Sequence, residues 1–237
     1  SLESTYGVTP HSDIEKIVEK FPPPTPEPGA DRVLCSVNPE EEVLCSLTRN
    51  VRERETSFAC LVAEAMAWSY RDDNGIDNVQ GGLINGGFIR GNTQYPPGTA
   101  IKKKDIDLET PFDRCPILVD IEGEKFKFGL EQMISKDLPM ASFPHFSEGI
   151  EMVYDFEKPP LNRIISLKVQ GEEVQNDQIY RIAFSDFYIE GAGDCVDGFL
   201  NQTEVKAHKR LIRECLLEYL EFKGIVSGNC PGRCRHV

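Results

Sequence analysis

Residues 51–66 read VRERETSFACLVAEAM, and the two halves of this stretch carry different patterns. From residue 58 onward, apolar residues recur at the spacing of one helix face, namely Phe58, Leu61, Val62, Ala65 and Met66. Thr56 or Ser57 stands where a hydroxyl caps the exposed N–H groups of a first helical turn. Before them, Arg52 and Arg54 alternate with glutamates, which indicates a strand with both arginines on one face. The stretch therefore predicts a strand, a turn and a buried helix.

Strand and helix patterns alternate along the rest of the chain. Apolar alternation or short apolar runs predict strands at 33–37, 42–47, 117–121, 149–154, 163–169 and 179–184. Residues 79–90 read as a short buried strand that enters a glycine-rich loop. Helical spacing predicts one helix over 126–134 and a long C-terminal helix from 205 to 220. This order predicts an α/β (α+β) domain with layered mixed β-sheets flanked by helices.

The N-terminal end of the chain has a composition of its own. Residues 11–21, HSDIEKIVEKF, read as a short amphipathic helix, and FPPPTPEPGAD at 21–31 reads as a linker. Proline fixes φ and cannot donate a backbone hydrogen bond, so the helix ends where these prolines begin. We expect residues 1–31 to form an N-terminal helix and a proline-rich linker, and residues 32–237 to form the domain.

Composition narrows the classes of partner. The 237 residues carry a formal charge of −13, and 40% of them are hydrophobic. No apolar run approaches the ~18 residues of a membrane span, so we expect none. The acidic balance also disfavours binding to a nucleic acid polymer, because such proteins present clustered Lys and Arg to the phosphate backbone. An anionic ligand must therefore meet a local basic pocket.

Eight cysteines leave the cellular compartment open. Cys60 and Cys215 fall on apolar helix faces, which predicts buried thiols. Cys230 and Cys234, in CPGRC, are compatible with a disulfide, with a metal site completed by other ligands, or with two thiols in a loose tail.

Three further motifs follow residues 51–66 in order. They are LINGGFIR at 83–90, PPGTAIKKKDIDLETPF at 96–112, and a last block that runs from FPHFSEG at 143–149 to SDFYIEGAGDCVDGF at 185–199. Together the four motifs resemble the C-terminal, substrate-recognising domain of the 5'-nucleotidase family, of the ecto-5'-nucleotidase and UDP-sugar hydrolase type. The resemblance covers residues 51–199. The chain departs from the family pattern at Ser57 and Ala59, where Asn and Gly are usual, and by extra residues before the final DGF.

The resemblance implies a role for each motif in binding a nucleoside monophosphate or related nucleotide. Aromatic rings suit the flat base, since base–aromatic stacking contributes roughly 1–3 kcal/mol per base. A carboxylate suits the ribose diol, and arginine, with an amide beside it, suits phosphate or sugar oxygens. Glycines let the backbone adopt positive φ and approach a ligand. The implied substrate-binding residues are Phe112 and Phe187 for the base, Asp197 for the diol, Arg52, Arg54, Arg90 and Asn85 for phosphate or sugar, and Gly86 and Gly87 for the loop.

Most of these residues also have a purely structural interpretation. On composition alone, core packing is the more common role of Phe112 and Phe187. Asp197 before a glycine is a common turn pair, and Asp194 competes with it for the diol. Surface ion pairs are the alternative for Arg52 and Arg54, although binding is slightly favoured, for Arg52 before Arg54. A Gly pair alone is typical of an ordinary turn.

No residue of this chain is predicted to be catalytic. Family members hydrolyse phosphate esters with two divalent metal ions bound by a separate N-terminal metallophosphoesterase domain, which the resemblance does not place in this sequence. The four histidines are scattered, and His145 in FPHFSEG favours a packed role over metal ligation. We expect a recognition domain that is inactive alone, from a parent 5'-nucleotidase. The alternatives are a diverged binding or interaction module on the same fold and, less favoured, an enzyme with a cryptic site.

Overall fold

The structure is a computed structural model that describes residues 28–70, 78–189, 197–199, 203–207 and 210–237. Residues 31–237 form one compact unit. The helix predicted at 11–21 lies outside the described residues, as do Asp194 and Cys195. None of the helices in the described ranges combines the length and the apolar character needed to cross a membrane.

A five-stranded mixed sheet forms the centre of the fold, in the strand order β12-β6-β11-β3-β7. Its strands are β12 (Thr203–Ala207), β6 (Pro116–Glu122), β11 (Ile179–Ser185), β3 (Gly81–Asn85) and β7 (Pro144–Phe146). The long strand β11 pairs antiparallel with β6 and parallel with β3, with Ala183 opposite Leu118 and Gly82. Both kinds of pairing in one sheet, with helices against it, confirm the predicted fold class.

Side chains of the central strands point alternately into two cores. Ile84, Leu118 and Ala183 belong to the first core. The residues next to them that belong to the second core are Leu83, Ile117, Val119, Ile182 and Phe184. Successive residues of a strand face opposite sides of a sheet, so β3, β6 and β11 are buried on both faces. This double burial explains why these segments read as continuous apolar runs.

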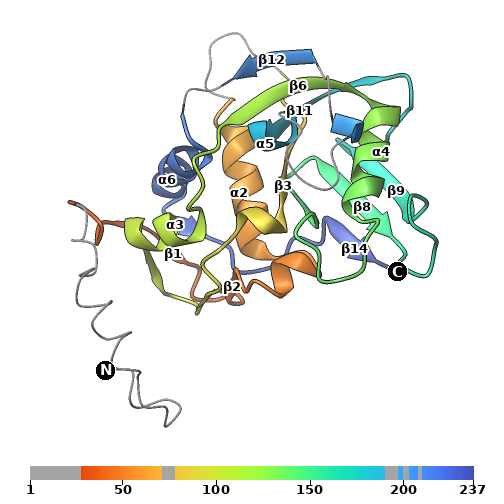
Figure 1. The fold of residues 1–237 in the computed structure, drawn as a ribbon. Coiled ribbons are helices and arrows are strands. Elements are labelled where there is room, and N and C mark those ends of the chain that lie inside the picture. The colour runs from red at the N-terminus through yellow and green to blue at the C-terminus, as the bar shows by residue number, and fades with distance from the viewer. Residues whose placement is uncertain (1–27, 71–77, 190–196, 200–202, 208–209) are drawn as a thin grey trace, which may run out of the picture. The chain divides into compact units, whose positions relative to one another are not determined.

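Helices and smaller sheets cover the two faces (Figure 1). The first core contains side chains of α2, α6 and β1, and the second contains side chains of α4, β8, β9 and β14. The helices are α2 (Ser57–Trp68), α3 (Lys103–Glu109), α4 (Gly123–Met133), α5 (Asp186–Ile189) and α6 (Ile212–Lys223). The smaller sheets comprise β1 (Val33–Val37), β5 (Ala100–Lys102) and β13 (Ile225–Val226); β8 (Ile150–Tyr154), β9 (Ile164–Val169), β10 (Glu172–Glu173) and β14 (Cys234–His236); and β2 (Leu44–Cys45) with β4 (Gln94–Tyr95).

Two sequence predictions about local structure are wrong. Residues 50–52 form a short 3-10 helix, η2 (Asn50–Arg52), and a turn follows it, so Arg52 and Arg54 do not share a strand face. The helix expected from 205 to 220 is a strand, β12, followed by the helix α6. Because β6 would otherwise expose its edge N–H and C=O groups, pairing with β12 outweighs the local helical pattern.

The helix predicted from residue 58 is confirmed, although its cap differs from the expectation. Helix α2 begins at Ser57 with Thr56 in the cap position, but no side chain caps its first turn. Ser57 Oγ instead accepts a hydrogen bond from the N–H of Cys45, at 3.1 Å. The cysteines of the described ranges are all thiols, and Cys60 and Cys215 are buried as predicted. Cys234 is buried in β14, so the C-terminal segment is packed rather than loose.

His145 joins β7 to the segment before α2. Its Nε2 lies 2.9 Å from the carbonyl oxygen of Val51, to which it donates in the neutral ring. The ring is fully buried, and burial lowers the pKa of His145 from 6.5 to about 4. The packed role expected for this histidine is therefore confirmed.

This burial predicts a specific loss of stability in acid. Between pH 6.5 and 4 the unfolded chain binds a proton at His145 that the folded chain excludes, so stability falls as pH falls. A shift from 6.5 to about 4 corresponds to about 3 kcal/mol. Urea unfolding of wild type and of the non-titrating His145→Gln variant at pH 7, 5.5 and 4 measures how the free energy of unfolding changes with pH. We expect the stability advantage of wild type to shrink by that amount, and parallel pH profiles would contradict the burial.

Candidate nucleotide-binding site

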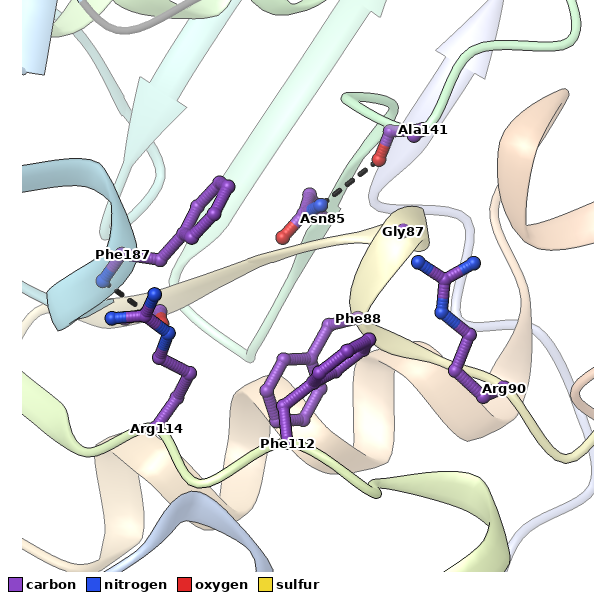
Figure 2. A pocket seen from close by; sticks show the side chains of 9 residues that line it. Asn85, Gly87, Phe88, Arg90, Phe112, Arg114, Ala141 and Phe187 are labelled. Carbon is purple, nitrogen blue, oxygen red and sulfur yellow. Dashed lines mark hydrogen bonds between the residues drawn. The ribbon is translucent and has the colours of Figure 1, made fainter. Parts of the chain in front are cut away.

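A cavity of about 320 Å³ opens where the carboxyl ends of β3 and β11 meet the segment after α3 (Figure 2). Its wall combines aromatic rings, guanidinium groups and small residues. The lining residues are Asn85, Gly87, Phe88, Arg90, Phe112, Arg114, Ala141, Ser185 and Phe187. Four separate segments of the chain therefore build one cavity.

The glycine-rich loop is held by backbone contacts. The N–H groups of Gly86 and Gly87 donate to the carbonyls of Phe143 and Ala141, at 2.8 and 2.7 Å. A Cβ on Gly86 would lie 1.7 Å from the carbonyl oxygen of Val51, so only glycine allows this approach. Neither glycine has positive φ, which corrects that part of the expectation. The glycines bring protein backbone close to protein backbone, and Asn85 Nδ2 donates to the same Ala141 carbonyl, at 3.0 Å.

Two phenylalanine rings face the cavity from different elements. Phe112 follows α3 and is 38% exposed, and its ring contacts Phe88 with centroids 5.9 Å apart. Phe187 stands in α5 and is half-buried. Figure 2 shows both rings beside the same space. Neither is a fully buried core residue, and both rings line the cavity.

Two arginines on one side of the cavity lie close enough to affect each other. Partial burial, and then the charge of Arg52, lower the pKa of Arg90. Arg52 Nε is buried and has no hydrogen-bond partner among the described residues. No described carboxylate forms an ion pair with either arginine. In a chain of charge −13, this uncompensated positive charge favours an anionic ligand.

Arginine also stacks on each of the two rings. The Arg90 guanidinium carbon lies 5.2 Å from the ring centroid of Phe112, and that of Arg114 lies 5.3 Å from the centroid of Phe187. Both distances are within the range of cation–π attraction. The rings and the cations thus form two preassembled pairs.

The structure places the expected site residues in three groups. Asn85, Gly87, Arg90, Phe112 and Phe187 line the cavity. Gly86 packs against the backbone of Val51, and Arg52 is close enough for its charge to act on Arg90, but neither residue lines the cavity. Arg54 is exposed and does not line it either. Asp197 opens the short helix η4 (Asp197–Phe199) against α4, and its carboxylate accepts a hydrogen bond from Gln132 Nε2 at 3.2 Å, outside the cavity lining.

Sequence reasoning missed several lining residues. Phe88 lies inside the NGGFIR motif itself, and an aromatic residue directly after two glycines was an available signal. Arg114 follows Phe112 by two residues in PFDR. Ser185 and Ala141 carried no signal, because only the fold brings the end of β11 and the 138–142 segment to the cavity.

A family model described as the 5'-nucleotidase C-terminal domain matches residues 38–200. The chain belongs to this family. The match covers the glycine-rich loop and all three phenylalanines of the cavity, Phe88, Phe112 and Phe187. The resemblance stated from the four motifs is confirmed.

Proteins of similar sequence support this family assignment. The 5'-nucleotidase of Mus musculus is 24% identical over 163 residues, which is 64% of this chain and 28% of the relative. The 5'-nucleotidase of Bos taurus is 24% identical over 162 residues, again 64% of this chain and 28% of the relative. This chain therefore matches little more than a quarter of the length of these relatives.

Solved structures share the fold at low sequence identity. The 5'-nucleotidase precursor of Thermus thermophilus superposes with a TM-score of 0.78 at 20% identity, covering 94% of this chain and 42% of that one. The NAD nucleotidase of Haemophilus influenzae superposes with a TM-score of 0.68 at 16% identity, covering 94% and 40%.

Proposed function

We propose that this domain recognises the nucleoside part of a nucleotide for a 5'-nucleotidase-type phosphohydrolase that takes part in nucleotide breakdown. One observation carries the proposal: two partly exposed rings, Phe112 and Phe187, border one cavity with Arg90 and Asn85 in its wall. Membership of the family supports it.

The cavity offers a chemical partner to each part of a nucleoside monophosphate. The rings supply stacking surface for the base, which tolerates any base. Arg90, with Arg52 behind it, supplies forked donors for phosphate or sugar oxygens, and these charge-assisted bonds are the stronger kind. Asn85 keeps a carboxamide oxygen for a ligand hydroxyl while its Nδ2 donates to Ala141. The diol role of Asp197 stays a prediction from the family pattern, and the proposal does not rest on it.

Hydrolysis is assigned to another part of the parent protein. Among the described residues, no three His, Cys, Asp or Glu side chains are grouped so that they could hold a metal ion. The residues described here therefore do not fit the two divalent ions that the family implies. We propose that an N-terminal metallophosphoesterase domain supplies those ions, and the length of the relatives beyond the matched region leaves room for it.

Calorimetric titration of the chain with adenosine 5'-monophosphate and with adenosine tests the proposal. We expect saturable binding of the monophosphate with a Kd of about 0.1–1 mM, because the metal contacts to phosphate are absent. Replacement of Arg90 by Gln should weaken binding of the monophosphate roughly ten-fold, since a charge-assisted hydrogen bond contributes ~1.5–3 kcal/mol. Binding of adenosine should be weakened less.

The matched control is Arg49→Gln, which removes an arginine whose side chain is 82% exposed and does not line the cavity. It should leave both affinities unchanged. A folded chain that binds neither ligand at several millimolar would contradict the proposal and favour the diverged interaction module.

A further inference from the structure

Arg114 occupies the opposite side of the cavity from Arg90. Figure 2 shows the Arg114 guanidinium beside Phe187, whereas Arg90 lies on the other side of Phe112, toward Gly87. The guanidinium carbon of Arg114 is 5.3 Å from the Phe187 ring centroid. The Arg114 guanidinium therefore borders the part of the cavity next to Phe187, where we expect the base to lie.

Asp186 lies beside Arg114 as its acidic partner. Asp186 Oδ1 is 3.8 Å from Arg114 Nη1, and both side chains are only partly exposed. The carboxylate is itself fixed, because Oδ2 accepts a hydrogen bond from the N–H of Cys115 at 3.0 Å. The N–H of Asp186 donates to the Cys115 carbonyl, also at 3.0 Å. A fixed carboxylate thus lies beside the Arg114 guanidinium.

The charges of the cavity distinguish its two sides. Arg52 and Arg90 have no described carboxylate partner, whereas Arg114 has Asp186 beside it. A phosphate dianion is attracted more strongly to the uncompensated pair. The side with Arg114 consequently remains for the neutral end of the ligand, which is the base.

Resting on the proposed function, we infer that Arg114 reads the base edge and that the cavity prefers 6-oxopurine nucleotides, those of hypoxanthine and guanine, over adenine nucleotides. A guanidinium donates hydrogen bonds and accepts none. A 6-oxopurine presents two adjacent acceptors, O6 and N7, which match the guanidinium fork. Adenine presents N7 but places an amino donor at position 6, opposite another donor. Arg114 thus adds a preference for 6-oxopurines to two rings that accept any base by stacking alone.

Inosine and adenosine 5'-monophosphates are the matched probes, because their bases differ at the position-6 substituent and the adjacent N1 proton. Titration of wild type should give a Kd for the inosine nucleotide roughly ten-fold lower, the lower part of the range for bidentate base contacts. Arg114→Gln should bring the ratio of the two Kd values close to one. Arg114→Lys, which keeps the charge without the fork, should give an intermediate ratio and controls for loss of folding.

The control Arg49→Gln should keep the wild-type ratio. Equal affinities in wild type, or a preference that survives Arg114→Gln, would overturn the role of Arg114 while leaving nucleotide binding in place. Absence of binding by both nucleotides, or binding that Phe112→Ala does not weaken, would instead overturn the proposed function and this inference with it.

Discussion

Replacement of Glu55 by Ala should destabilise the domain by about 3–5 kcal/mol, because its carboxylate anchors the C-terminal segment. Glu55 is only 8% exposed. Its two oxygens accept hydrogen bonds from the N–H groups of Gly232 (2.7 Å), Arg233 (2.8 Å) and Cys234 (3.2 Å). Loss of the carboxylate leaves three donors without their acceptor at the start of β14.

The position of Glu55 adds to this effect. It stands one residue before the cap of α2, where the positive end of the helix dipole favours a carboxylate. Glu55→Gln keeps the shape but turns an amide donor toward one of the N–H groups, so we expect about 2 kcal/mol or more.

Glu53→Ala is the matched control for Glu55. Glu53 is two residues away and pairs with the exposed Arg49, so its loss should cost under about 1 kcal/mol. Urea unfolding measures all three variants. Equal stabilities for Glu55→Ala and Glu53→Ala would show that the C-terminal segment is not anchored this way.

Loss of either cavity ring should weaken nucleotide binding roughly ten-fold, since stacking contributes ~1–3 kcal/mol per base. We expect this for Phe112→Ala and for Phe187→Ala in calorimetric titration with a nucleoside monophosphate. Phe187 also packs against the second core. Phe187→Leu therefore serves as a second variant that keeps apolar volume and loses the π-face.

Phe222→Ala is the control for these two substitutions. Phe222 is 68% exposed on α6 and contacts Trp68, with ring centroids 5.3 Å apart and outside the cavity lining. Its loss should leave affinity unchanged. Affinity retained by folded Phe112→Ala and Phe187→Leu would reduce both rings to a structural role.

Local patterns predicted those parts of the fold that burial alone determines. The buried face of α2 and the apolar runs of β6 and β11 could be predicted, because the spacing of apolar residues along a short segment indicates a helix or a strand. The paired strands β8 and β9 were predicted for the same reason. The resemblance of four ordered motifs to the family brought Asn85, Phe112 and Phe187 together as candidates, and all three line the cavity.

Contacts between distant residues could not be predicted in this way. Glu55 and its three hydrogen-bond donors are 177 to 179 residues apart in the sequence. The alternation of Arg and Glu around Glu55 therefore suggested a strand, whereas in the fold its carboxylate binds the C-terminal segment. Arg114 and Phe187 meet only because α5 follows β11 next to β6. β12 depends on an edge of β6 that no local window contains.

A crystal structure of the chain with inosine 5'-monophosphate at a saturating concentration tests the central claim most directly. We predict the purine between the rings of Phe112 and Phe187, with the phosphate toward Arg90 and the O6 edge toward Arg114. A nucleotide bound elsewhere, or an empty cavity at a concentration that saturates the chain in solution, would contradict recognition of the nucleoside at this site.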